Sequence, residues 1–310
     1  MVHADTLHHR IRDARRRFER AGIAPAEAAI DADVLARHAL GGWERGQLLM
    51  RQHDACPAGF APVFEALARR RERREPTGYI IGHREFWNLD FDVRAGVLVP
   101  RPETELLVEE ALSRLSFWAA NTPARTAPAD AGAAAPIRVA DVGTGSGCIA
   151  IALARWLPAA TITAIDISDA ALAVARLNAA RHDVSDRVRF VRGDLLDAVT
   201  GPFDAVVSNP PYVPAPDLDG LQPEVRDHEP LAALVAGDDG LDVIRRLVPD
   251  AATALRPGGW LLFEFGFGQS AGVHGIIEAE PRLALVETCP DLAGIPRIAV
   301  ARRVESGQQR

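Results

Sequence analysis

The spacing of apolar residues changes along the chain and divides it into three parts. In the first part the apolar positions recur three and four residues apart, as they do from Leu7 to Phe18, and this spacing predicts helices. The same pattern predicts helices from Ala28 to Ala39 and from Phe60 to Arg74. We therefore expect a small domain of four or five helices over residues 1–77.

From Gly78 onward the pattern predicts extended structure. Residues 85–93 alternate apolar and polar side chains around a turn, which indicates a β-hairpin. Pro100 and Pro102 then stop the extended structure, and a helix is expected over 105–115. We interpret residues 78–100 as a β-hairpin linker between two domains.

The third part, residues 101–310, alternates short apolar strands with helices. Residues 119–136 are rich in alanine and proline and contain no large apolar side chain, so we expect a mobile surface insertion there. The segments after it predict a mainly parallel sheet with helices on both faces. The expected strands are 138–142, 161–165, 188–191, 203–207, 260–265, 284–288 and 297–301, and the expected helices are 148–157, 170–182, 241–255 and 271–279.

The charge balance argues against a protein that binds nucleic acid through bulk attraction. The chain has 35 basic and 42 acidic residues, although residues 1–85 carry 15 arginines against 12 acids. The run Arg69–Arg74 is interpreted as a solvated helix face, with contact to an acidic partner as the alternative. Lysine is absent from the sequence, which excludes Schiff-base chemistry.

The three cysteines are widely spaced and show no metal-ligand pattern, so neither a disulfide framework nor a metal site is expected. No apolar run is long enough to span a membrane, and the N-terminus lacks a signal peptide's apolar core. We expect a cytoplasmic monomer.

Polar residues follow four successive predicted strands. The first ends in Asp141 and a loop of glycines that lets a ligand approach the main chain and the next helix. Asp166 can accept hydrogen bonds from a ribose diol, Asp194 can reach an adenine amino group, and Leu195 can pack on the ring. Any one carboxylate could instead be a helix cap, as Asp169 is expected to be. The loop residues are Gly143, Thr144, Gly145, Ser146 and Gly147.

The fourth strand ends abruptly at Asn209, Pro210, Pro211 and Tyr212. The Asn209 carboxamide oxygen and the Pro210 carbonyl can accept both hydrogens of one planar NH2 group, while Tyr212 covers its face. This predicts a pocket for an amide or amino nitrogen. A plain strand-to-loop corner is the alternative for an Asn-Pro pair in isolation.

In these features the chain resembles class I S-adenosylmethionine-dependent methyltransferases, and specifically the HemK/PrmC family of peptide chain release factor glutamine methyltransferases. The resemblance covers nearly the whole chain. The residues that carry it include 30–35, 84–87, the Val-Pro-Arg-Pro-Glu-Thr-Glu segment 99–105, the glycine loop, 209–212, 228–234 and 291–294.

The resemblance implies a Rossmann-like seven-stranded mixed sheet with an antiparallel last strand, behind a helical domain that helps to dock the protein substrate. It implies S-adenosylmethionine as cofactor and the glutamine of the Gly-Gly-Gln motif of bacterial release factors as methyl acceptor. By motif, residues 143–147, Asp166, Leu195 and Asn209 hold the cofactor, and residues 209–212 hold the glutamine. Asp194 is added from its position.

Three alternatives stay open. Ribosomal-protein glutamine methyltransferases resemble the chain but differ in the 99–105 segment. A nucleic-acid amino-methyltransferase would also need a site for a planar NH2 group, but the acidic second part and the lack of a basic, aromatic-rich region argue against it. A nucleotide-binding module without turnover is disfavoured by the intact residues 209–212.

Overall fold

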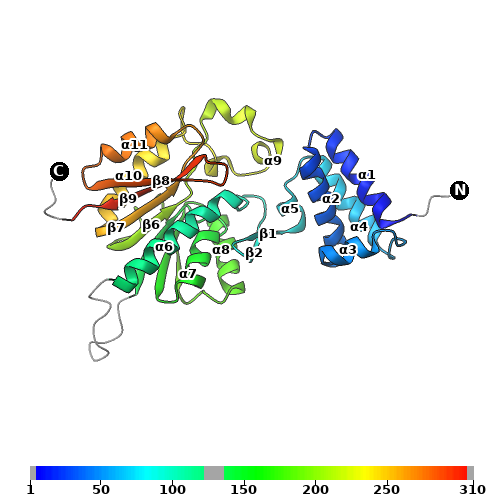
Figure 1. The fold of residues 1–310 in the computed structure, drawn as a ribbon, viewed down its shortest axis with the longest axis horizontal. Helices are drawn as coiled ribbons and strands as arrows, with labels where there is room; N and C mark the ends of the chain where they lie inside the picture. The colour runs from blue at the N-terminus through cyan, green and yellow to red at the C-terminus, as the bar shows by residue number, and fades with distance from the viewer. Residues whose placement is uncertain (1–4, 122–135, 306–310) are drawn as a thin grey trace. The chain divides into compact units, whose positions relative to one another are not determined.

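The computed structural model describes residues 5–121 and 136–305 (Figure 1). The described residues form two compact units. The first comprises Met1–His83 with Gln222–His228, and the second comprises Arg84–Leu221 with Glu229–Arg310. None of the described helices combines the length and the apolar character needed to cross a membrane.

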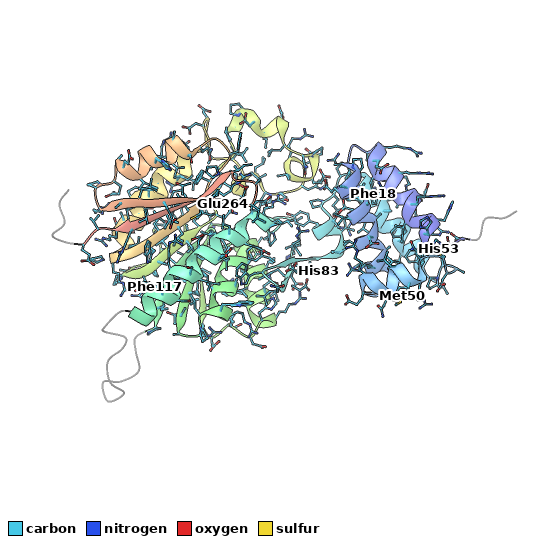
Figure 2. The ribbon with its side chains drawn as sticks, viewed as in Figure 1. Phe18, Met50, His53, His83, Phe117 and Glu264 are labelled. Carbon is cyan, nitrogen blue, oxygen red and sulfur yellow. The ribbon has the colours of Figure 1, made fainter. Side chains whose placement is uncertain are left out.

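The first unit is helical, as the apolar spacing predicted. Its helices are α1 (Leu7–Arg20), α2 (Pro25–Ala39), α3 (Arg45–Arg51), α4 (Phe60–Glu72) and α5 (Thr77–Ile81), together with the short α9 (Pro223–Arg226). Its core includes Leu7, Phe18, Leu35 and Phe64, all nearly inaccessible to solvent. Phe18 is labelled within this bundle in Figure 2.

Two expectations for this unit are wrong. Residues 78–81 are helical rather than extended, because the buried side chain of Ile80 packs into the helical core and α5 ends only before Gly82, where φ is 85°. The run Arg69–Arg74 is not uniformly solvated either. Arg71 is 1% exposed and donates to Asp31 at 2.6 Å and to Glu224 at 2.6 Å.

The β-hairpin is confirmed. Its strands are β1 (His83–Phe86) and β2 (Leu89–Asp92), which form a two-stranded sheet. Trp87 and Asn88 make the turn with φ of 53° and 56°, a left-handed conformation that suits a tight two-residue hairpin. The next elements are the 3-10 turn η1 (Pro102–Thr104) and α6 (Glu105–Asn121). Residues 119–121 of the expected insertion end this helix, and residues 122–135 lie outside the described residues.

The second unit is built on a seven-stranded sheet in the order β5-β4-β3-β6-β7-β9-β8. Neighbouring strands from β5 to β7 are parallel, whereas β9, the last strand, is antiparallel to both of its neighbours. The mixed sheet is therefore as expected. Its strands are β3 (Ile137–Val142), β4 (Ala160–Asp166), β5 (Val188–Arg192), β6 (Phe203–Ser208), β7 (Leu255–Glu264), β8 (Leu283–Pro290) and β9 (Pro296–Arg303).

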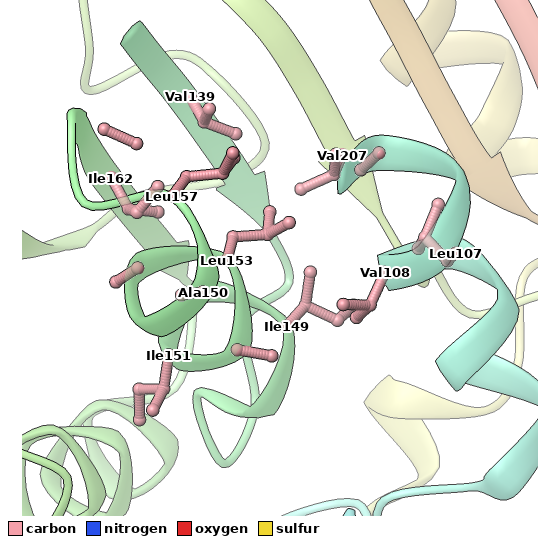
Figure 3. Close-up of a cluster of buried hydrophobic side chains, with 14 of the residues drawn as sticks. Leu107, Val108, Val139, Ile149, Ala150, Ile151, Leu153, Leu157, Ile162 and Val207 are labelled. Carbon is pink, nitrogen blue, oxygen red and sulfur yellow. The ribbon is translucent and has the colours of Figure 1, made fainter. Parts of the chain in front are cut away.

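Helices cover both faces of this sheet (Figure 1). On one face α6 packs with α7 (Cys148–Trp156) and α8 (Asp169–Arg181), and on the other α10 (Asp242–Ala254) packs with α11 (Ser270–Glu278). Figure 3 shows how Val108 of α6 and Ile149 of α7 meet beneath the sheet, near Val207 of β6. Two 3-10 turns, η4 (Ala215–Gly220) and η5 (Leu231–Ala233), complete the described elements.

Candidate active site

The carboxyl ends of the parallel strands line up at one edge of the sheet. Val142 pairs with Ile165 and with Ser208, and Ser208 pairs with Phe263. From β3 the chain adds β4 and then β5 toward one edge of the sheet, and from β6 it adds β7 toward the other edge. The strand order therefore reverses between β3 and β6. Open α/β sheets bind ligands in the crevice at such a reversal.

The loop after β3 is held in a fixed shape by its own contacts. Gly143, Gly145 and Gly147 have φ of 72°, 57° and 84°, which other residues adopt at a cost. A Cβ atom on Gly147 would lie 3.0 Å from Ile151 Cδ1, so this residue lets the loop pack closely on its surroundings. Thr144 donates from Oγ1 to the buried Asp141 at 2.6 Å, which ties the loop to the strand.

A cavity of about 340 Å³ opens at this edge and brings most of the predicted site together. Its lining combines apolar walls with a few polar side chains, which is typical of small-molecule sites. Within the described ranges Gly147 and Tyr212 are not among the lining residues. The predicted residues that do line it are Gly143, Thr144, Gly145, Ser146, Asp166, Asp194, Leu195, Asn209, Pro210 and Pro211.

The carboxylates at the cavity differ in their surroundings. Asp166 accepts from the backbone N–H of Gly145 at 2.8 Å and of Ser168 at 2.8 Å, and burial raises the pKa of its carboxyl. Asp194 is more exposed and accepts from Arg246 at 2.7 Å. The expectation that Asp169 caps its helix is wrong, because Ser168 is the N-cap and its hydroxyl accepts from Ala171 N–H.

Asn209 is tied into a chain of buried polar groups. Its Nδ2 donates to Thr104 Oγ1 at 2.9 Å, and the Thr104 hydroxyl donates to Glu264 Oε2 at 2.7 Å. The Tyr212 hydroxyl donates to the other oxygen, Glu264 Oε1, at 3.0 Å. Thr104 and Glu264 are each 2% exposed, and Glu264 is labelled in the second unit in Figure 2. Sequence reasoning missed both as site residues.

The 99–105 segment contributes further contacts at the cavity. Arg101 lines the cavity and donates to Glu229 Oε1 at 2.7 Å, whose side chain is 1% exposed. Glu105 does not line it. Its Oε1 accepts from the backbone N–H of Trp87 at 2.8 Å, so Glu105 supports the hairpin turn.

Comparison with known proteins identifies the family. A family model described as the PrmC N-terminal domain matches residues 10–82, and one described as the methyltransferase small domain matches residues 131–219. A release factor glutamine methyltransferase of Nitratidesulfovibrio vulgaris is 39% identical over 96% of this chain and 95% of its own length. The one from Geobacter sulfurreducens is 44% identical over 76% of each chain.

The chain belongs to the family of release factor glutamine methyltransferases. Among solved structures, the hMettl16 catalytic domain in complex with the MAT2A 3′UTR hairpin 1 has a TM-score of 0.50. It is 18% identical over 73% of this chain and 80% of its own length, so this likeness concerns the fold alone. Release factor glutamine methyltransferases use S-adenosylmethionine as methyl donor. The resemblance seen in the sequence, and the cofactor that it implied, are therefore confirmed.

The cavity suits this cofactor. A nucleoside with a positively charged sulfonium needs apolar walls for the base, an acceptor for the ribose and access to main-chain groups at a glycine loop. Val97, Leu98 and Leu195 supply apolar walls, Asp166 supplies a carboxylate, and Gly143 and Gly145 leave the loop without side chains.

Proposed function

We propose that this chain methylates the side-chain amide nitrogen of the glutamine in the Gly-Gly-Gln motif of bacterial peptide chain release factors. Two of its relatives, at 39% and 44% identity, are named for that reaction. The observation that carries the proposal is the hydrogen bond from Asn209 Nδ2 to Thr104, because it turns the amide oxygen of Asn209 away from Thr104 and makes it available to a substrate.

Asn209 Oδ1 and the Pro210 carbonyl accept the two hydrogens of the substrate amide. A planar NH2 group held by two acceptors points its nitrogen in one direction, which aligns it for in-line transfer. Both acceptors also favour the positive charge that develops on the nitrogen during the reaction. Pro210 is buried and Asn209 is half-buried, so this part of the site is sheltered from water.

The bound cofactor supplies a methyl group that its sulfonium already activates. Asp166 accepts from the ribose hydroxyls, Asp194 from the adenine amino group, and Leu195 packs on the ring. Leu195 is 8% exposed and has φ of 56°, so its backbone conformation is set by the fold around it. Residues 143–147 approach the rest of the cofactor through their main chain.

Proton transfer needs no dedicated base in this proposal. The amide nitrogen becomes acidic only after it has gained the methyl group, and it then loses its proton to water. Tyr212 packs on the amide plane, and its phenol stays protonated because burial and the nearby Glu264 raise its pKa. A neutral Tyr212 keeps donating to Glu264, which anchors the end of the 209–212 segment.

The helical unit, which continues to His83, docks the release factor, the residues from there to Pro100 form the linker, and residues 101–310 form the catalytic domain. The excess of arginine over acidic residues in 1–85 supports a docking role toward an acidic surface. The enzyme acts as a monomer in the cytoplasm, where release factors work, and binds no nucleic acid directly.

A parallel assay tests the choice of substrate. Labelled S-adenosylmethionine is offered with a release factor, a ribosomal protein or RNA. The proposal expects label on the release factor alone. Label on the ribosomal protein alone would assign the chain to the related glutamine methyltransferases, and label on RNA alone would favour an exocyclic amine as acceptor.

A further inference from the structure

We propose that Glu264 is a specificity-determining residue that acts through Thr104. It fixes Asn209 with its oxygen toward the substrate, so that the site takes an amide NH2 group and rejects the carboxylate of glutamate, which has the same shape. This inference rests on the proposed function. It assigns a role to two residues that lie behind Asn209 rather than at the reacting atoms.

The hydrogens available in this polar chain are few. An ionised carboxylate only accepts hydrogen bonds, and a hydroxyl has a single hydrogen to donate. Thr104 lies 2.7 Å from Glu264 Oε2 and therefore donates its hydrogen there. Toward Asn209, 2.9 Å away, the Thr104 oxygen can only accept.

Only one orientation of the Asn209 amide satisfies that acceptor. Nδ2 carries hydrogens and Oδ1 does not, so Nδ2 must face Thr104 and Oδ1 must face the substrate. Without the carboxylate, nothing in this chain of bonds would distinguish the two orientations, since an amide is nearly symmetric in shape. The charge on Glu264 thus sets which atom the substrate meets.

The three groups are held by rigid parts of the fold. Glu264 ends β7 one residue after Phe263, which pairs with Ser208, so the register places Glu264 beside the start of the 209–212 segment. Thr104 ends η1, directly before α6. Both side chains are buried, and buried polar networks with every member bonded strongly favour one arrangement.

The ionised state of Glu264 is opposed by its burial and supported by its partners. On balance the pKa of Glu264 is raised, because burial outweighs the hydrogen bonds from Thr104 and Tyr212, which lower it; the nearby Glu103 adds to the rise and Arg297 opposes it. A protonated Glu264 would have its own hydrogen to donate to Thr104. The Thr104 hydrogen would then be free to meet Asn209 Oδ1, and the orientation would no longer be fixed.

This arrangement discriminates between glutamine and glutamate. A carboxylate oxygen placed against Asn209 Oδ1 and the Pro210 carbonyl would have no hydrogen to share with either. Sites built to bond an N–H or O–H group reject an analogue that lacks it by about 10⁴-fold or more.

The test compares two ligands on the wild-type enzyme and four variants. The substrate is a release factor, and the competitor is the same factor with glutamate in place of the Gly-Gly-Gln glutamine. In Glu264→Gln the new amide can donate to Thr104, which reverses both hydrogen bonds and lets Asn209 present Nδ2. We expect kcat to fall by about tenfold or more. The preference, which is the inhibition constant of the glutamate factor divided by KM for the glutamine factor, should fall by at least a similar ratio.

Further variants separate this role from a general loss of structure. Thr104→Val removes the relay and should lose the preference as Glu264→Gln does, whereas Thr104→Ser keeps the hydroxyl and should restore it. Glu278→Gln, on the exposed face of α11, makes the same chemical change away from the site and should keep the wild-type ratio. Thermal unfolding and cofactor affinity report on folding.

The outcomes are distinct. A folded Glu264→Gln or Thr104→Val variant that keeps the wild-type preference overturns the inference and leaves the proposed function standing. A wild-type enzyme that does not methylate the glutamine factor at all overturns the proposed function itself. A fall in preference as the pH is lowered, present in the wild type and absent in Glu264→Gln, supports the role of the charge.

Discussion

Replacing Asn209 with alanine removes one of the two acceptors that we propose for the substrate amide. The Asn209 side chain is oriented by a 2.9 Å bond to a buried hydroxyl, so it is ordered before the substrate arrives. Removing one such preorganised group from an active site costs about 2.7–4 kcal/mol of transition-state stabilisation, a fall of about 10²–10³ in kcat. We expect KM for the release factor to change much less, because most of the docking surface is untouched.

The assay is transfer of a labelled methyl group to a release factor at saturating cofactor, with kcat and KM determined separately. Asn88→Ala, an exposed asparagine in the hairpin turn, serves as the matched control and should keep wild-type turnover. Thermal unfolding shows whether each variant is folded. A folded Asn209→Ala enzyme with kcat within a few-fold of wild type would refute the positioning argument.

Three further predictions concern the fold and the glycine loop 143–147. Arg71→Met leaves buried carboxylates unpaired and should lower the free energy of unfolding, measured by urea denaturation, by about 3–5 kcal/mol. The control Arg69→Met removes an exposed ion pair and should lower it by about 1 kcal/mol or less. Burial raises the pKa of Asp141 from 3.8 to about 7. The free energy of unfolding without cofactor should therefore fall as the pH rises from about 4 to about 7 and level off above that, and Asp141→Asn should remove this slope. Gly147→Ala forces φ of 84° on a residue with a Cβ and should destabilise the fold by about 1–3 kcal/mol, measured by thermal unfolding.

A contrary result is defined for each of these three predictions. Equal effects of the two arginine variants would mean that the buried ion pairs are dispensable. A pH slope that survives in Asp141→Asn would assign it to another group, and an unaltered melting temperature in Gly147→Ala would show that the loop relaxes without strain.

Much of the sheet could be predicted because its signals are local. Each strand is a short apolar run, and the polar residue that ends it, such as Asp166 or Asn209, stands next to that run in the sequence. Parallel strands then bring these ends to one edge by topology alone. The prediction for residues 78–81 was wrong because their signal is not local. Their helix depends on the packing of Ile80 against other helices.

The residues that were missed depend on contacts between distant parts of the chain. Thr104 and Glu264 are 160 positions apart, and their meeting requires the register of β7 against β6 as well as the placement of η1. A signal for Glu264 did exist, because it ends the apolar run 261–263 as Asp166 ends its own strand. Arg71 looked solvated because its partners lie 40 and 153 positions away.

Mass-spectrometric mapping of a release factor incubated with the enzyme and S-adenosylmethionine tests the proposed reaction at the level of the atom. The prediction is a single added methyl group on the side-chain amide of the Gly-Gly-Gln glutamine, formed about 10²–10³ times more slowly when Asn209→Ala replaces the wild type. A methyl group on any other residue, or an unmodified factor under conditions where the enzyme methylates RNA, would contradict it.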